Sequence, residues 1–428
     1  MVRPLFRLEL ITTICFTFTI AVIEGGVISV FTKQTFEPVT PRSQLNLFVA
    51  FLGATPELAN ILSFLWSWLS QGRRKIFLIN WLQVAVIGAV ASLAIVPTSY
   101  LGLWMLAIIA FIARTCWSGI ITIRPTVWRA NYDRAARARV VASLSTAQML
   151  IAATMGIALG ALLDVDPEFY HLVVPGAAAV GLIAVYATNR LRVRHESRLR
   201  AQERHDAGAL TPIQSATVVV RVLRADRWYR RFMGCMFLLG LGNLMLPPIL
   251  VIILADRFQV GYLNSILITS AIPALITPLA IPMWSRMLDR AHVVRFRAIQ
   301  SWTFVGASLI MAVAAYFEIR ELLFLSAALQ GVGYAGGALA WNLGHVDFAP
   351  PSQTSQYMAT HVTLNGVRGL IAPFASVFLY EAARAAGFHT PGVVVILIAS
   401  GLAALGALGF SRLHVDMGPL TQNVNRKA

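Results

Sequence analysis

The chain has 428 residues, of which 57% are hydrophobic and only 13% charged, and its mean hydropathy is +0.69. A water-soluble protein of this length does not reach these values, because polar and charged side chains must cover its core. The formal charge is +16, but the basic residues flank apolar segments instead of gathering on a polar face, which argues against nucleic acid as a partner. The composition indicates an integral membrane protein.

Twelve apolar segments are long enough to cross a bilayer, which takes about 20 residues. In chain order the predicted helices span residues 8–31, 44–70, 76–96, 100–123, 138–163, 169–189, 232–255, 262–284, 298–317, 321–345, 357–381 and 392–413. The first segment is not followed by a small-residue cleavage site, so we expect it to be retained as a span. The sequence therefore predicts an all-α membrane protein.

The segment 190–231 divides these helices into two sets of six and carries eleven arginines. It cannot enter the bilayer core, where each arginine costs several kcal/mol. We expect it to be a basic cytoplasmic linker between bundles at 1–189 and 232–414, with a cytoplasmic tail at 415–428. Within it, residues 218–232 alternate apolar and arginine side chains, which predicts an amphipathic helix lying on anionic headgroups; a solvated linker is the alternative.

The positions of lysine and arginine predict the orientation. The face shared by both termini and the linker carries 27 of them and the opposite face five, while Arg114, Arg124 and Arg368 lie within spans. Basic loops stay in the cytoplasm, so both termini should be cytoplasmic. The 32 arginines against three lysines are typical of a GC-rich bacterial genome, and we expect the bacterial inner membrane.

Four ionisable residues are predicted near the middle of spans. Glu24 lies in the first helix, Glu57 in the second beside Pro56, Arg114 in the fourth and Arg368 in the eleventh. Charged groups in the hydrocarbon region are costly unless they pair or face water, so each is a functional hypothesis. A carboxyl group in apolar surroundings can bind and release a proton near neutral pH, so Glu24 and Glu57 are predicted to carry protons.

Further polar side chains predict a solute site. His361, Asn365 and Arg368 recur at spacings of four and three, which places them on one helix face. A guanidinium there suits a carboxylate or phosphate, and pairing of Arg368 with Glu24 or Glu57 to hold the bundles together is the alternative. Asn243 and Tyr334 are predicted to contact the solute, although each can equally serve helix packing.

Patterns of soluble enzymes are absent from the sequence. It contains no phosphate-binding loop, zinc-protease motif or Gly-x-Ser-x-Gly, and its three cysteines lie in apolar segments without a Cys-x-x-Cys pair. We expect no catalytic residue, no metal and no cofactor.

The fourth helix and the loop after it contain a series of residues that resembles a known family motif: Arg114, Gly119, Pro125, Asp133, Arg137 and Arg139. Together with Gly72-Arg73-Arg74-Lys75 and the segment 329–333, it is similar to the major facilitator superfamily of secondary transporters over essentially the whole chain. The resemblance implies two pseudo-symmetric six-helix bundles. It also implies a solute cavity lined by helices one, four, seven and ten, which places Glu24, Arg114, Asn243 and Tyr334 in it.

The resemblance further implies a set of gating residues: Arg73, Arg74, Asp133, Arg137, Asp289 and Arg290. In the loop after the second helix, the acidic and first basic positions of the family pattern fall on Leu69 and Ser70. The loop after the eighth helix keeps both, as Asp289 and Arg290.

The predicted function is a secondary transporter that moves a small anionic or zwitterionic solute by alternating access, coupled to protons through Glu24. Its predicted partners are the solute, membrane lipids and protons. An efflux antiporter exchanging drugs or other amphipathic compounds for protons is the first alternative. A membrane receptor that transports nothing, or a lipid-modifying enzyme on the same scaffold, is the second.

Overall fold

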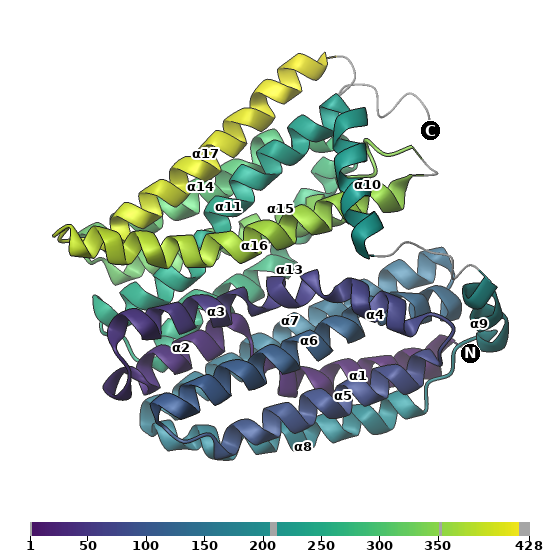
Figure 1. Cartoon of the computed structure of the whole chain (residues 1–428), viewed down its shortest axis with the longest axis horizontal. Coiled ribbons are helices and arrows are strands. Elements are labelled where there is room, and N and C mark those ends of the chain that lie inside the picture. Colours follow the sequence, from purple (N-terminus) through teal and green to yellow (C-terminus); the bar gives the residue numbers. More distant parts are fainter. Residues whose placement is uncertain (1, 206–211, 351–352, 419–428) are drawn as a thin grey trace. The chain divides into compact units, whose positions relative to one another are not determined.

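A computed structural model describes residues 2–205, 212–350 and 353–418, and the regular structure in these ranges is helical throughout. The helices form two compact units (Figure 1). Unit 1 comprises Met1–Leu210 and Gly261–Ile266, and unit 2 comprises Thr211–Val260 and Leu267–Ala428. Residues 206–211 of the predicted linker and 419–428 of the predicted tail lie outside the described residues.

Unit 1 contains the first set of spans. Its helices are α1 (Val2–Val22), α2 (Gly25–Thr35), α3 (Arg42–Ile61), α4 (Ser63–Ser70), α5 (Lys75–Ser92), α6 (Tyr100–Asn131), α7 (Arg134–Val165), α8 (Tyr170–Asn189), α9 (Glu196–His205) and the short α12 (Tyr262–Ile266), with single 3-10 turns at Glu37–Val39, Leu93–Ile95 and Pro167–Phe169. Asp164 at the end of α7 holds α12 by accepting hydrogen bonds from the amides of Tyr262 (2.5 Å) and Leu263 (3.2 Å).

Unit 2 contains the second set. Its helices are α10 (Pro212–Ala225), α11 (Arg227–Asp256), the π-helical turn Leu267–Ala271, α13 (Ile272–Leu288), α14 (Val293–Phe317), α15 (Arg320–Leu343), α16 (Thr354–Ala385) and α17 (Pro391–Met417).

Among the described residues, eleven helical segments are long and apolar enough to cross a membrane, with α1 and α2 counted as one, and they correspond to eleven of the twelve predicted spans. The prediction of one continuous helix over 44–70 is wrong, because a turn at Leu62 separates α3 from α4. Pro56, inside α3, removes one backbone donor, and Asn46, Glu57 and Asn60 make this helix less apolar than the others.

Within each unit the helices pack closely where small residues face a neighbouring helix. In unit 1, α1 packs against α7 and α8, and α5 packs against α6 and α8. A Cβ atom on Gly119 of α6 would lie 2.8 Å from Leu82 Cδ1 of α5. In unit 2, α17 packs against α11 and α14, and a Cβ atom on Gly406 would lie 2.7 Å from the amide nitrogen of Leu239. Only glycine permits these approaches, as in other membrane helix pairs.

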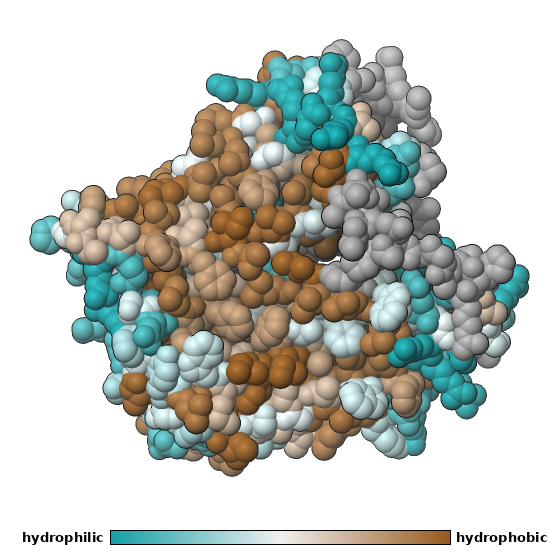
Figure 2. Space-filling view, viewed as in Figure 1, coloured by the Kyte–Doolittle hydropathy of each residue, from teal (hydrophilic) through white to brown (hydrophobic). Residues whose placement is uncertain are grey.

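Large apolar side chains cover the outer surface of the helices. The exposed fraction of Trp81 is 67% and that of Leu279 is 75%. Figure 2 shows apolar side chains spread along the helices on the visible face, while polar ones gather near helix ends. A surface of this kind is stable in contact with lipid, since every backbone polar group of a helix is paired internally. The predicted class, an all-α integral membrane protein, is confirmed.

The linker forms two helices that belong to different units. The predicted continuous helix over 218–232 is wrong, because it breaks at Asp226, whose carboxylate accepts hydrogen bonds from the amides of Trp228 and Tyr229 at 2.9 Å each. Val219 and Val222 of α10 are buried within unit 2, where α10 packs against α16 and α11. This apolar face is therefore covered by protein.

Candidate functional site

The first span is interrupted near its middle. It was predicted to be continuous, but α1 ends at Val22 and α2 begins at Gly25, with Glu24 between them in an extended backbone conformation. The Gly25-Gly26 pair explains the break, because glycine lowers helix stability by about 1 kcal/mol per residue. Carbonyl groups at the end of α1 therefore lack partners within the helix.

Arg114 of α6 fills this break. Its Nε and Nη2 atoms donate to the main-chain oxygen of Ile23, at 3.0 Å and 2.6 Å, and Nη2 also donates to Glu24 Oε2 at 3.1 Å. The structure thus brings together two residues that the sequence singled out separately, Glu24 and Arg114. A freed carbonyl and a carboxylate hold one guanidinium in a fixed orientation.

The two partners differ in exposure. The side chain of Arg114 is 6% exposed and that of Glu24 is 45% exposed. The two N–H groups on Nη1 of Arg114 donate to no residue in the described part of the chain. The guanidinium is therefore anchored on one side and keeps two donors for a further acceptor, beside a carboxylate that solvent reaches.

Glu57 lies on the helix that faces the start of α2. It is half-buried on α3, directly after Pro56, and a Cβ atom on Gly25 would lie 4.0 Å from Pro56 Cγ. Glu57, the second predicted proton carrier, thus lies on α3, the helix next to the interrupted first span.

A second polar cluster lies inside unit 2, around Arg368. Its Nε donates to Asn365 Oδ1 at 3.0 Å, Nη2 donates to the same oxygen, and Nη1 donates to the main-chain oxygen of Met236 at 2.6 Å. His361 is fully buried on the same helix, and neither of its ring nitrogens has a hydrogen-bond partner. The three residues that the helical spacing placed on one face are all buried together in unit 2.

Arg297 belongs to this cluster and was missed, because sequence analysis counted it with the loop arginines before α14. It is buried in α14, where Nη1 donates to Gln300 Oε1 at 2.5 Å, and Nε and Nη2 donate to Met236 Sδ at 3.2 Å and 2.8 Å. Met236 therefore joins the two arginines, through its sulfur to Arg297 and through its carbonyl to Arg368. In the sequence, the signal for this buried cluster was Gln300, which lies one helical turn after Arg297 inside a predicted span.

The two neutral candidates also lie in unit 2. Asn243, on α11, is half-buried, and its Oδ1 has no partner among the described residues. Tyr334, on α15, is exposed and accepts a hydrogen bond from Gln330 Nε2 at 3.3 Å. Both side chains keep hydrogen-bonding capacity for a ligand.

A buried ion pair in unit 1 was also missed. Arg124 Nη2 of α6 donates to Glu9 Oε2 of α1 at 3.1 Å, and Glu9 is almost completely buried. Glu9 escaped attention because it lies near the start of the first span, where charged residues are ordinarily solvated.

The six predicted gating residues lie at or near helix ends, four in unit 1 and two in unit 2. Asp133 caps α7 by accepting from the amide of Ala136 at 2.7 Å, and Arg73, Arg74, Asp289 and Arg290 are exposed at helix ends. Among the described residues, no ion pair joins two of the six within either unit.

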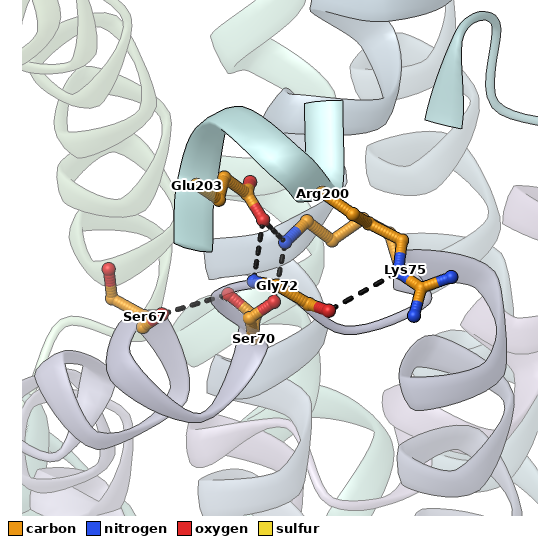
Figure 3. Close-up of polar contacts among 6 residues, drawn as sticks. All are labelled: Ser67, Ser70, Gly72, Lys75, Arg200 and Glu203. Atoms are coloured by element: carbon orange, nitrogen blue, oxygen red, sulfur yellow. Dashed lines mark hydrogen bonds and ion pairs between the residues drawn. The ribbon is translucent and has the colours of Figure 1, made fainter. Parts of the chain in front are cut away.

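The loop between α4 and α5 is instead held by the linker helix α9, as Figure 3 shows. Glu203 Oε2 accepts from Lys75 Nζ at 2.6 Å and from the amide of Gly72 at 2.8 Å, while Arg200 Nε donates to the Gly72 carbonyl at 3.2 Å. Lys75 is buried, and its Nζ also donates to the Ser70 carbonyl. The Glu203 carboxylate of α9 thus binds the α4–α5 loop, in which Leu69 occupies the position that is acidic in the family pattern.

The described ranges contain no group of three or more His, Cys, Asp or Glu side chains that could hold a metal ion. The polar residues above offer guanidinium, carboxylate, amide and hydroxyl groups, which suit hydrogen bonding to a small solute.

Comparison with known proteins shows similarity in fold. Among solved structures, the chain is similar to the nucleoside transporter NupG (TM-score 0.74, 13% identity, covering 96% of this chain and 99% of that one). It is also similar to a D-xylose–proton symporter (0.72, 14%, 96% and 98%) and to the peptide transporter POT in complex with sulfate (0.74, 12%, 98% and 96%). No curated protein sequence matches the chain.

A family model described as Major Facilitator Superfamily matches residues 10–373. The protein is therefore an integral, multi-pass membrane transporter of the secondary kind and not an enzyme. The chain belongs to the Major Facilitator Superfamily.

Proposed function

We propose that this transporter moves a small anionic or zwitterionic solute by alternating access, together with protons, and that Arg114 and Glu24 form its coupling centre. The observation that carries the proposal is the guanidinium of Arg114, anchored on the Ile23 carbonyl with two N–H donors unused. A guanidinium with unused N–H groups in a site of low dielectric constant suits a carboxylate or phosphate oxygen.

Coupling follows from competition for one guanidinium. The Glu24 carboxylate and an anionic solute both require Arg114, whose Nη2 atom is 3.1 Å from Glu24 Oε2. A proton on Glu24 removes its negative charge and weakens this ion pair, which leaves the guanidinium to the solute. Protonation and solute binding then favour each other, and this linkage is what a symporter needs.

Unit 2 supplies the second set of contacts in this proposal. Arg368, oriented by Asn365 and the Met236 carbonyl, provides a second cation, and Asn243 and Tyr334 provide neutral hydrogen bonds. Glu57 is proposed as a second proton carrier.

A direct experiment uses purified protein in sealed vesicles that contain the pH-sensitive dye pyranine. Nucleosides, pentoses, short peptides and mono- and dicarboxylates are added one at a time, since structural neighbours carry solutes of the first three kinds. Entry of protons with one anionic or zwitterionic member of the panel supports the proposal. Uptake of solutes without proton movement, or no uptake of any member, contradicts it.

An antiporter for amphipathic cations is the second candidate, favoured by the exposure of the Glu24 carboxylate. In the same vesicles, prepared with an acidic interior, amphipathic cations would then cause protons to leave. Transport should persist in this case after Arg114→Ala, because a cationic solute does not need the guanidinium.

We also propose that the protein lies in a bacterial inner membrane with both termini in the cytoplasm, as the distribution of basic residues favours. Labelling of single cysteines introduced at the two ends of the chain by an impermeant reagent tests this orientation. In this arrangement α9 and the α4–α5 loop lie on the cytoplasmic side. We propose that they gate this side together with Arg73, Arg74, Asp133, Arg137, Asp289 and Arg290.

A further inference from the structure

A second polar site lies inside unit 1, enclosed by α1, α5, α6 and α8. It is a cavity of about 10 Å³, and its polar walls are Glu9, Thr12, Gln83, Arg124 and Thr188. A cavity of this size has room for about one water molecule. The described chain therefore encloses a polar space, one water wide, among apolar helices.

Two of these walls present oxygens that lack a partner. Glu9 Oε1 and Gln83 Oε1 are buried without a hydrogen bond, and each residue is only 1% exposed. Other polar groups around the cavity are paired: Arg124 Nη2 donates to Glu9 Oε2 at 3.1 Å and to Thr13 Oγ1 at 2.7 Å, and the hydroxyls of Thr12 and Thr188 lie 3.2 Å apart. Buried acceptors are almost always paired, so these two oxygens have room for a donor that the described residues do not supply.

The charges in the walls limit what the donor can be. One carboxylate is balanced by one guanidinium, which leaves no net negative charge for a metal cation and offers too few oxygen ligands. A water molecule can donate to both oxygens, and a proton on Glu9 converts one acceptor into a donor. A water molecule and a protonated Glu9 carboxyl group can both take part in proton transfer.

Arg124 keeps other contacts when Glu9 is protonated and neutral. Without the ion pair it keeps its hydrogen bond to Thr13 and its position over the ring of Trp128, 5.3 Å from Cζ to the ring centroid. The other titratable group near Glu9 is Tyr132. Burial, with a further contribution from the Glu9 carboxylate, raises the pKa of Tyr132 to about 12, so Tyr132 stays protonated and does not compete for the site.

We propose that Glu9 is a further proton-binding carboxylate of this transporter, beside Glu24 and Glu57, which exchanges its proton through one water molecule held by Gln83 while Arg124 supplies the opposing charge. A hydronium ion gives one proton to the Glu9 carboxylate and leaves a carboxylic acid and a neutral water molecule. Arg124 keeps its charge in both states, so the cavity changes from neutral to singly positive. The proposal deepens the proton coupling proposed above and relies on it for its role in transport.

Infrared difference spectra of the purified full chain, recorded between neutral and acidic pH, test the proton site without any solute. The carbonyl band of a protonated carboxyl group should decrease by one component in Glu9→Gln and be restored, at a shifted frequency, in Glu9→Asp. Gln83→Leu removes the second acceptor without removing the acid, and it should change the pH dependence of that component. Arg129→Gln, a substitution at an exposed position of α6, serves as a control and should change nothing.

The result that overturns the proposal is a Glu9→Gln spectrum identical to that of the unmodified chain. If Glu9→Gln does not fold, an unchanged titration midpoint in both Glu9→Asp and Gln83→Leu overturns it equally. Since these spectra need no solute, failure of the proposed transport function would leave the proton-binding result standing, and the two failures can be told apart.

Discussion

Arg114 donates two hydrogen bonds to the main-chain oxygen of Ile23, at the break in the first membrane span. The break creates a carbonyl that no helix amide satisfies, and the arginine satisfies it while also pairing with Glu24. Backbone geometry and a charged side chain thus build one site. This explains why a buried arginine, which is costly in a membrane, is stable at this position.

Arg114→Ala should reduce solute-driven proton entry at least about tenfold, which corresponds to about 1.4 kcal/mol. It should also destabilise the fold by about 1–3 kcal/mol, because the Ile23 carbonyl loses its donors in a buried site. The rate of proton entry and the stability of Arg114→Lys should lie between those of the unmodified chain and those of Arg114→Ala, since an ammonium keeps the charge but not the planar set of donors. The control is Arg129→Ala on the same helix, where the side chain is exposed. Equal effects at both positions would contradict this assignment.

Glu203→Gln should loosen the linker. Lys75 is buried and would lose its carboxylate partner, so trypsin should cleave within α9 several times faster and the unfolding temperature should fall. Removing one partner of a buried pair costs more than replacing both, so Glu203→Gln combined with Lys75→Met should be more stable than Glu203→Gln alone. Glu196→Gln, in the first turn of α9, is the matched control. A double variant less stable than the single one would argue against the ion pair.

Met236→Leu should destabilise unit 2 more than Met233→Leu does. Both methionines are buried on α11 in the same core, but only the sulfur of Met236 accepts from Arg297. Leucine conserves volume, so the packing cost is similar, while loss of the sulfur leaves guanidinium N–H groups unsatisfied at a cost of about 1–3 kcal/mol. Thermal unfolding followed by tryptophan fluorescence measures the difference. Equal shifts for the two variants would show that the sulfur contacts contribute nothing.

His292 should make stability depend on pH. Burial lowers the pKa of His292, an effect that the nearby Asp347 carboxylate opposes and His414 reinforces, and its neutral Nδ1 accepts from the Val294 amide at the start of α14. Because the folded pKa lies below the unfolded value of about 6.5, the contribution is fully present above that pH and is lost as pH falls below it. His292→Asn keeps a capping acceptor that does not titrate. Its unfolding temperature should therefore fall less than that of the unmodified chain between pH 7.5 and pH 5.5, which lie about 1 unit on either side of the unfolded pKa. His389→Asn, at an exposed position, should behave like the unmodified chain.

The sequence predicted the membrane class and most of the helices, and it singled out Glu24 and Arg114, which the structure places in contact, because charge within an apolar segment is visible in one dimension. It did not predict that α1 and α2 are separate helices, although Gly25-Gly26 lies at the break, since a helix can continue through a glycine pair inside a span or end at it. Glu9, Arg297 and Glu203 were missed for a common reason. Each lies near the end of a span or in the linker, where solvation is the ordinary expectation, and only tertiary packing reveals that Glu9 and Arg297 are buried and that Glu203 reaches Lys75.

Solute-driven proton entry in pyranine-loaded vesicles containing Glu24→Gln tests the coupling centre most directly. With the solute that acidifies vesicles of the unmodified chain, the account predicts that Glu24→Gln abolishes acidification while exchange of labelled for unlabelled solute continues. Acidification by Glu24→Gln at the rate of the unmodified chain would contradict it.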